Sequence, residues 1–266
     1  MLKLLALLML LSSTAWAGVD FDGVDDSMTV GTMGNFGTGL DTNFLVFSSW
    51  VKSAETGALM CVSGEFNTGI VTSYQFYLNT ANGTNLNAGY IYYFRRDQDG
   101  QVRNGGVASN TGITDGSWHH LLITVSHSDQ GVWVDGVSQS ITTITTGTPD
   151  NMANFGFNAI YGANNVRGTL AAYFEGTLTD VALGSVATKP TDAEALNLAS
   201  KVKRMPLQFP TIFNGFYHAL DGQPNGTSFD GDVTKDLSGT GNNGTGSDGA
   251  NNTGLTAKAE EVLSYA

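Results

Sequence analysis

Apolar and polar residues alternate along most of this chain, and the alternation predicts β-strands. Residues 45–51 follow a period of two, yet both of their faces are largely apolar, which is typical of a strand covered on both sides. Residues 119–126 repeat this pattern, and residues 74–78 and 90–95 form aromatic-rich runs of strand length. A last long strand is expected over 173–183. The pattern as a whole predicts an all-β fold.

Turn and helix signals are confined to short stretches. The Asp-Gly pair at 135–136 lies between apolar runs and predicts a tight hairpin, because a primed turn needs positive φ angles. One short helix is expected near 191–200, since Thr191 can cap the exposed amides while Glu194 reaches back to complete a capping box. The basic residues of 201–204 would then complement the helix dipole; the alternative is a processing site.

Composition agrees with strands joined by turns and narrows the classes of partner. Glycine reaches 34 of 266 residues, charged residues make up only 14%, and the formal net charge is −12. An acidic surface repels polyphosphates, whose binding depends on cationic neutralisation, so nucleic acid and anionic membranes are disfavoured as partners. The single cysteine, Cys61, cannot form an internal disulfide and is expected to be a buried thiol.

The N-terminus has the pattern of a secretory signal peptide over residues 1–17. Lys3 precedes an apolar run at 4–11, and small residues at 15 and 17 form a cleavage pattern. The run is shorter than the roughly 20 apolar residues of a membrane span. We expect a protein that is secreted, or displayed on a cell or virion surface, and that starts at Gly18. The alternative is a retained hydrophobic tail.

Five phrases of the chain occur in an order that is typical of one known family. They are FDGVDD at 21–26, FSSWVK at 47–52, DGSWHH at 115–120, VWVDGV at 132–137 and GTLTDV at 176–181. Over roughly residues 19–200 the chain resembles the laminin-G-like branch of the concanavalin A-like lectin/glucanase superfamily. The resemblance implies a jelly-roll β-sandwich of two antiparallel sheets, which agrees with the strands read from the pattern.

Composition changes towards the C-terminus and suggests two regions after the signal peptide. Residues 18–205 hold the family phrases and are expected to form the laminin-G-like sandwich. Residues 206–266 are a Gly- and Asn-rich extension that is expected to pack on the sandwich and to end in a short helix over 256–263.

Part of this extension is unusual in its position. Residues 236–245 resemble the opening segment that in this family precedes the phrase at Phe21, yet here they come last. We hypothesise that residues 213–246 return to the place of the first strand and complete a sheet edge that would otherwise be open. The alternative is a flexible tail.

Catalytic signatures are lacking in the sequence. Glycanases of this superfamily carry a Glu-x-Asp-x-x-Glu strand, and hydrolysis needs two carboxylates on opposite sides of the glycosidic bond. No glutamate here falls in that spacing, although Glu65 and Glu175 could meet in space. There is no Gly-x-Ser-x-Gly elbow and no phosphate loop, and His119 shares the strand parity of Leu121, which favours a hydrogen-bonded ring at the core edge. We expect no enzyme, with glycan hydrolysis as an alternative.

A structural calcium ion is implied by the resemblance. In related sandwiches an ion joins the N-terminal phrase to an aspartate of the final strand, so Asp180 would supply a carboxylate, and Asp22 and Gly23 would supply oxygens. Ca²⁺ takes six to eight oxygen ligands, so backbone carbonyls and water must contribute. Asp25 and Asp26 fit a role as turn residues equally well.

Aromatic residues within 74–95 are the expected ligand-binding surface, because the C–H faces of sugars stack on aromatic rings. Tyr92 lies on one strand face and Tyr93 and Arg95 on the other, and one of these faces must turn to the core. We assign ligand binding to Tyr93 and Arg95 on the exposed side, together with Tyr74.

These observations predict a secreted, non-catalytic recognition or adhesion module that binds carbohydrate or another cell-surface ligand. The main alternative is a structural surface protein of a cell envelope, fibre or virion, in which the sandwich mediates assembly into homo-oligomers. The fold by itself cannot choose between them, because folds of this class host many functions.

Overall fold

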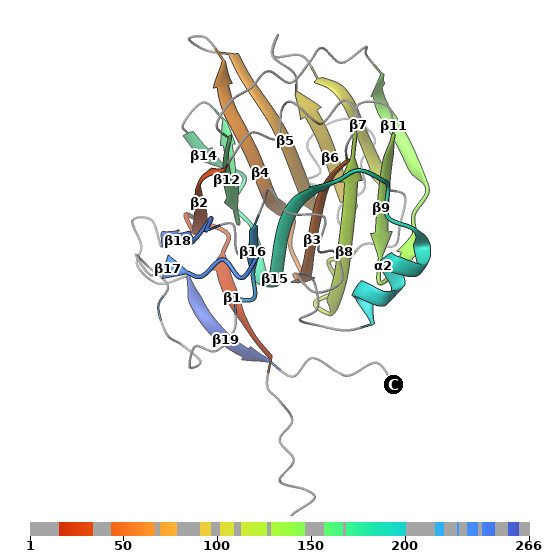
Figure 1. Cartoon of the computed structure of the whole chain (residues 1–266). Coiled ribbons are helices and arrows are strands. Elements are labelled where there is room, and N and C mark those ends of the chain that lie inside the picture. The colour runs from red at the N-terminus through yellow and green to blue at the C-terminus, as the bar shows by residue number, and fades with distance from the viewer. Residues whose placement is uncertain are drawn as a thin grey trace, which may run out of the picture.

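The computed structural model of this chain describes residues 16–33, 44–66, 70–78, 91–96, 102–108, 113–126, 129–146, 157–166, 169–200, 216–220, 228, 233–238, 241–247 and 255–260. Within them, two antiparallel sheets form a β-sandwich with one helix outside it, so the expected all-β jelly-roll fold is confirmed (Figure 1). None of the helical structure in these ranges is long and apolar enough to cross a membrane.

Sheet A is the layer built around the family phrases. Its strands are β1 (Trp16–Asp22), β3 (Phe44–Lys52), β8 (Trp118–Val125), β9 (Gln130–Val134), β10 (Val137–Ser138), β15 (Glu175–Val186), β16 (Phe216–His218) and β19 (Thr256–Glu260). They follow the order β10-β9-β8-β3-β15-β1-β19, and β16 pairs with β15 beside this path. Residues 45–51 of β3 are all buried, as the two apolar faces of this run predicted.

Sheet B is the opposite layer. Its strands are β2 (Ser27–Met33), β4 (Gly57–Phe66), β5 (Ile70–Leu78), β6 (Ile91–Arg96), β7 (Val102–Ala108), β11 (Ile141–Thr146), β12 (Phe157–Tyr161), β17 (Val233–Thr234) and β18 (Gly244–Ser247). The order is β11-β7-β6-β5-β4-β12-β2-β18-β17. Two short strands, β13 (Asn164–Val166) and β14 (Thr169–Ala171), form a separate hairpin.

The local turn and helix signals of the sequence are confirmed. The β9–β10 hairpin turns at Asp135 and Gly136, whose φ angles of 51° and 77° are those of a primed turn. Helix α2 spans Asp192–Ala199 and begins at the expected capping box. The Thr191 hydroxyl accepts a hydrogen bond from the Glu194 amide, and the Glu194 carboxylate accepts one from the Thr191 amide at 2.7 Å.

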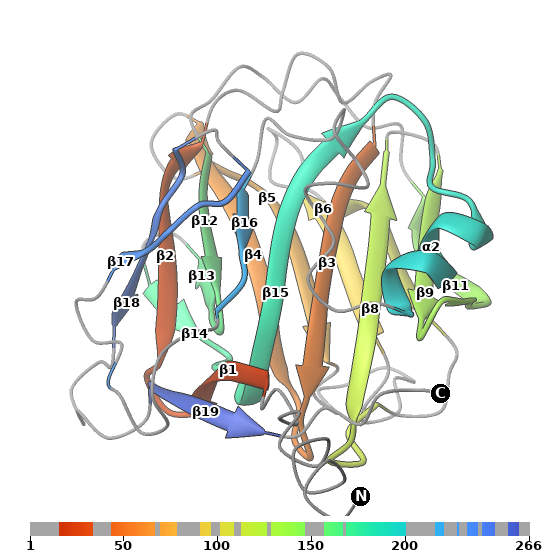
Figure 2. The same ribbon diagram turned by 60° about the horizontal axis from the view of Figure 1, so that its bottom comes forward.

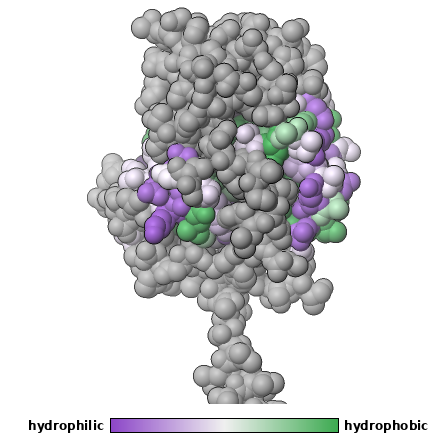
Figure 3. Space-filling model, viewed as in Figure 1, coloured by the Kyte–Doolittle hydropathy of each residue, from purple (hydrophilic) through white to green (hydrophobic). Residues whose placement is uncertain are grey.

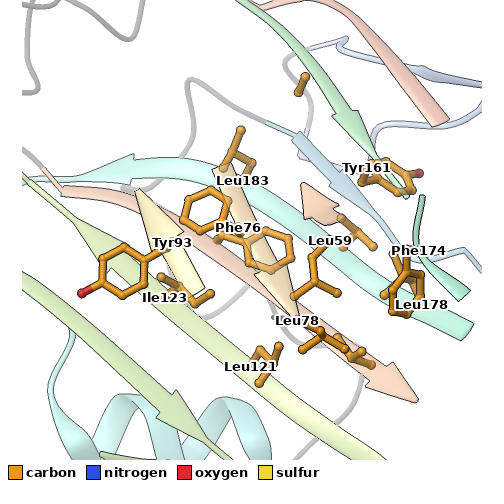
Figure 4. Close-up of a cluster of buried hydrophobic side chains, with 14 of the residues drawn as sticks. Leu59, Phe76, Leu78, Tyr93, Leu121, Ile123, Tyr161, Phe174, Leu178 and Leu183 are labelled. Atoms are coloured by element: carbon orange, nitrogen blue, oxygen red, sulfur yellow. The ribbon is translucent and has the colours of Figure 1, made fainter. Parts of the chain in front are cut away.

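The inner faces of the two sheets share one apolar core. Phe47 of sheet A stacks on Phe76 of sheet B, with ring centroids 5.2 Å apart and planes inclined by 15°. Figure 4 shows Tyr93 and Tyr161 among the aliphatic side chains of this core. Because burying a phenylalanine side chain contributes about 1.5–3 kcal/mol, this interior is the main source of stability.

The C-terminal part of the chain adds strands to both sheets. β16 and β19 pair with β15 and β1, whereas β17 and β18 extend sheet B beyond β2. The helix expected over 256–263 is wrong, because residues 256–260 form β19 against β1. An isolated short helix is marginal, and the open edge of β1 offers this segment a full ladder of backbone hydrogen bonds. The boundary near 205 and the basic residues of 201–204 lie outside the described residues.

Candidate functional site

The outer face of sheet A is covered by other parts of the chain. Helix α2 lies against the outer side of β8 and β9 (Figure 1). The Trp133 indole donates a 2.7 Å hydrogen bond to the Asp192 carboxylate of this helix. A second apolar cluster fills this layer, formed by Val46, Leu122, Trp133, Ala182, Val186, Ala195, Leu198, Tyr217 and Ala219. The outer face of sheet B is therefore the sheet face to consider for ligands.

No broad apolar area stands out on the described surface. The large hydrophobic side chains exposed by more than half are Val24, Val137, Leu196 and Leu237. In the view of Figure 3 the hydrophobic residues form small separate patches among hydrophilic ones. A ligand site on the described surface would therefore consist of a few defined side chains.

The structure reverses the expected orientation of β6. Tyr93 was expected on the exposed side, but it is fully buried and lies opposite Phe76 in the strand register, and burial raises the pKa of its hydroxyl (Figure 4). Tyr74 is buried in the same core. Strand parity groups the residues that share a face but does not say which face turns inward; here the aromatic stack between the sheets decides it. Arg95 pairs through its backbone with Tyr74 and Asn104, and its side chain lies outside the described residues.

The half-exposed aromatic residues of this region are Tyr77 on β5 and Tyr92 on β6. They are register partners, and their rings stack with centroids 5.9 Å apart and planes inclined by 25°. The Tyr77 hydroxyl donates a hydrogen bond to Oε1 of the buried Gln75 on the same strand face, which fixes the orientation of that ring. The two rings thus form a small ordered aromatic platform on the outer face of sheet B.

A cleft of about 420 Å³ lies at the end of sheet A where β1, β3 and β15 meet. Its charged lining consists of four carboxylates and one ammonium group, from Asp20, Asp22, Glu55, Glu175 and Lys52. The Ser53 hydroxyl lies 2.6 Å from the Glu175 carbonyl oxygen and 2.9 Å from that of Glu55, so it joins the two segments that bear the glutamates. The sequence did not indicate this pairing, because the two glutamates are far apart along the chain.

The phrase at 21–26 forms a turn beside this cleft. One carboxylate oxygen each from Asp22, Asp25 and Asp26 lie within 4.8 Å of one another. Asp22 accepts the Val24 amide at 2.8 Å, and its own amide donates to Asp26 at 2.7 Å, so the turn holds the carboxylates together. Gly23, with φ 78°, permits the turn, and a Cβ there would lie 2.8 Å from the Glu175 Cβ.

Asp180 does not join this turn. Asp22 pairs with Glu175 in the β1–β15 register, so Asp180 lies five residues further along β15, roughly 16 Å away at a strand's rise per residue. Its carboxylate instead accepts a 2.7 Å hydrogen bond from the Tyr217 hydroxyl. Three carboxylates in one turn fit a divalent cation, whereas the set that included Asp180 does not.

The histidine expected at the core edge is there. His119 is half-buried, with Nδ1 2.8 Å from Asp135 and Nε2 3.2 Å from Asp115. The hydrogen bond that His119 donates to the Asp135 carboxylate is the main cause of a raised His119 pKa, opposed in part by burial. Cys61 lies in β4, and its side chain is outside the described residues.

The geometry defines a laminin-G-like β-sandwich, and comparison with known proteins agrees. Residues 22–193 match the Laminin G 3 family model, described as the Concanavalin A-like lectin/glucanases superfamily. This match covers more than half of the chain. The chain therefore belongs to that superfamily, as its five phrases suggested.

Solved structures similar to this chain were found at low sequence identity. A candidate carbohydrate binding protein from Bacteroides ovatus ATCC 8483 aligns over 93% of this chain and 61% of its own, with a TM-score of 0.59 and 17% identity. The SAP-like pentraxin of Limulus polyphemus aligns over 70% of this chain and 82% of its own, with a TM-score of 0.48 and 14% identity. Mouse laminin α1 domains LG4-5 align over 82% of this chain and 50% of theirs, with a TM-score of 0.46 and 13% identity. Among curated proteins, none matches the sequence.

Proposed function

We propose that this protein is a secreted, non-catalytic recognition module that binds carbohydrate on the outer face of sheet B. The observation that carries the proposal is the stacked, half-exposed pair of Tyr77 and Tyr92. Ligand sites combine aromatic surface with a few placed polar groups, and here the buried Gln75 accepts a hydrogen bond from the Tyr77 hydroxyl. The candidate carbohydrate binding protein of Bacteroides ovatus supports the same function through its shared fold.

The stacked geometry suits a sugar ring better than a charged ligand. Two nearly parallel tyrosine rings offer apolar π surface to the C–H face of a pyranose, and their hydroxyls and neighbouring amides can bond to its hydroxyl groups. The overall formal charge of −12 disfavours strongly anionic polymers as partners.

Glycan-array binding of the full chain tests this function. Tyr92→Ala and Tyr77→Ala should each weaken binding about tenfold, the equivalent of about 1.4 kcal/mol. Tyr77→Phe keeps the ring and should keep most of the binding, and Tyr173→Ala, on a different part of the molecule, is the matched control. Unchanged binding by both alanine variants would remove the platform from the site.

Glycan hydrolysis remains the second candidate because Glu55 and Glu175 line one cleft. Both side chains are exposed to solvent, whereas a general acid is usually kept protonated by an apolar environment, and this difference favours binding without catalysis. The distinguishing assay is release of reducing ends from β-glucans. Activity that disappears in Glu175→Gln would establish a hydrolase.

Secretion is part of the same proposal. The leader pattern at 1–17 supports it, and removal after Ala17 would cost β1 only its first two register partners, because the pairing with β19 continues from Gly18 opposite Lys258. Mass spectrometry of the exported protein should give a chain that begins at Gly18. A product that retains Met1 would contradict cleavage at this site.

A calcium ion at the 22–26 turn also belongs to the proposal. The three carboxylates that converge there would supply its charged oxygens, and water or backbone carbonyls would complete the six to eight ligands that Ca²⁺ takes. Its function would be structural, since the turn joins β1 to β2 and thus one sheet to the other.

A further inference from the structure

The last strands of the chain occupy a central position in the fold. β1 pairs with residues 175–178 of β15, and β16 pairs with residues 181–183 of the same strand. β16 and β1 therefore lie end to end along one edge of β15, although some two hundred residues separate them (Figure 2). We call the described parts of 216–260 the C-terminal segment. Its strand β16 pairs with the part of the β15 edge that β1 leaves unpaired.

Buried hydrogen bonds fix this segment to the sandwich. The Tyr217 hydroxyl donates to the Asp180 carboxylate at 2.7 Å, and the Thr179 hydroxyl donates to the Ala219 carbonyl at 2.8 Å. His218 lies with Nδ1 3.0 Å from the hydroxyl of Tyr161 on the opposite sheet. All six residues are buried, so these bonds form a specific binding site for the segment, which we call the seat, rather than a general apolar contact.

The segment also organises itself around one carboxylate. Asp236 accepts hydrogen bonds from the amides of Tyr217 and Ser238, at 3.0 and 2.9 Å, and from the amide of Asn242 at 2.9 Å. The Asn242 carbonyl oxygen in turn lies 3.0 Å from Nε2 of His218. β16 and the described residues 236–238 and 241–243 thus bind the sandwich together.

Three strand edges depend on the C-terminal segment. β18 covers the edge of β2, β19 covers the edge of β1, and β16 covers residues 181–183 of β15. A sandwich whose C-terminal segment is unseated would expose all three, and exposed edges bind other strands. The strands that match these three edges are those of the C-terminal segment, and every other copy of the chain carries the same segment.

We propose that the C-terminal segment of one copy can occupy this seat on a second copy, so that copies assemble by strand exchange. Residues 201–215 are the covalent link to the sandwich, and 15 residues can span up to about 50 Å, which is enough to reach a neighbouring molecule. The hydrogen bonds are the same whether the segment comes from its own chain or from another. This inference concerns assembly and does not depend on carbohydrate binding.

Exchange is governed by protein concentration. The covalent link gives a chain's own segment an effective concentration of roughly millimolar, so the self-seated monomer dominates in dilute solution. At millimolar local concentration, or when chains refold together before the segment closes, a second copy competes. Because each copy both gives and receives a segment, the product is a reciprocal dimer or a head-to-tail chain.

A two-protein crosslinking experiment tests the exchange. Thr29 and Thr245 are exposed register partners on β2 and β18. Full-length Thr29→Cys and Thr245→Cys proteins, both with Cys61→Ser and with different tags, are unfolded, mixed, refolded together at rising concentration and then oxidised. We expect a disulfide-linked heterodimer whose yield rises with concentration, because exchange alone brings these two positions together between chains.

A mixture of Thr29→Cys with Ser138→Cys measures random collision, since Ser138 is also exposed but lies on β10 of the other sheet. Heterodimer that does not exceed this control at any concentration overturns the proposal. Light scattering of the wild-type protein refolded in the same way gives a second measurement without substitutions. A strictly monomeric mass at millimolar concentration also overturns it, whatever the glycan array shows.

Discussion

The Tyr217 hydroxyl donates a 2.7 Å hydrogen bond to the Asp180 carboxylate, and both side chains are buried. This bond ties the C-terminal strand β16 to the long strand β15 at a point where Asp180 has a left-handed backbone, with φ 50°. The carboxylate that the family resemblance assigned to calcium therefore anchors the C-terminal segment instead.

Removing this hydroxyl should destabilise the protein without altering its surface. Tyr217→Phe leaves a buried carboxylate without one of its donors, so we expect the free energy of unfolding to fall by about 1.5–3 kcal/mol. Urea denaturation measures the loss. Tyr173→Phe, which removes a hydroxyl from a less buried ring, is the control, and equal losses in the two variants would contradict the assigned importance of the bond.

Acid should weaken the fold through two buried histidines. Burial lowers the pKa of His218 and of His120 to about 4 from the ordinary 6.5. Between pH 6.5 and 4 these histidines therefore bind protons in the unfolded chain but not in the folded chain. The free energy of unfolding is highest above pH 6.5 and falls as the pH decreases towards 4, by roughly 3 kcal/mol for each histidine.

Urea denaturation at several pH values between 7 and 4 checks this expectation. His218→Asn should remove about half of the slope, because one of the two groups no longer titrates. His119 acts in the opposite direction, since its raised pKa gives stability that is present in acid and lost as the pH rises. Stability that is constant from pH 7 to 4 would contradict the burial of these rings as neutral groups.

Two glycines with similar backbone angles should respond differently to alanine. Gly162 and Gly116 have φ angles of 82° and 78°, so a side chain is strained at either position. A Cβ at Gly162 would lie 2.3 Å from the Phe21 ring, whereas a Cβ at Gly116 meets no atom within 4 Å. Gly116→Ala should cost about 1 kcal/mol, and Gly162→Ala should cost more than that because the core must also shift. Thermal denaturation of the pair separates backbone strain from the clash.

Calcium should raise the melting temperature if the 22–26 turn binds it. Asp25→Asn neutralises one of the three converging carboxylates. This variant should melt at the same temperature in excess chelator and in excess Ca²⁺. Asp129→Asn removes an exposed carboxylate that pairs with Lys189, far along the chain, and should leave the shift intact. A wild-type protein that melts at one temperature in both solutions has no site there.

Local features of the fold could be predicted from sequence because their causes are local. The strand at 45–51, the turn at Asp135 and Gly136, and the capping box at Thr191 each depend on residues a few positions apart. The five family phrases predicted the sandwich, because their order is typical of a family with that fold.

The site depended on relations that no local pattern contains. Tyr92 and Tyr93 alternate on β6, and only the packing of β5 against sheet A determines which of them faces inward. Likewise, Asp180 lies in β15 and Asp22 in the neighbouring β1, but the strand register pairs Asp22 with Glu175 and so separates it from Asp180.

The sequence alone determined that this chain is a sandwich of strands with an acidic surface and one capped helix, because periodicity, turn residues and charge act over short distances. Tertiary structure decided which aromatic rings reach solvent, which acids share a turn, and that residues 256–260 form a strand rather than a helix. These outcomes depend on long-range strand pairing, where a backbone edge supplied by one end of the chain selects the conformation of the other.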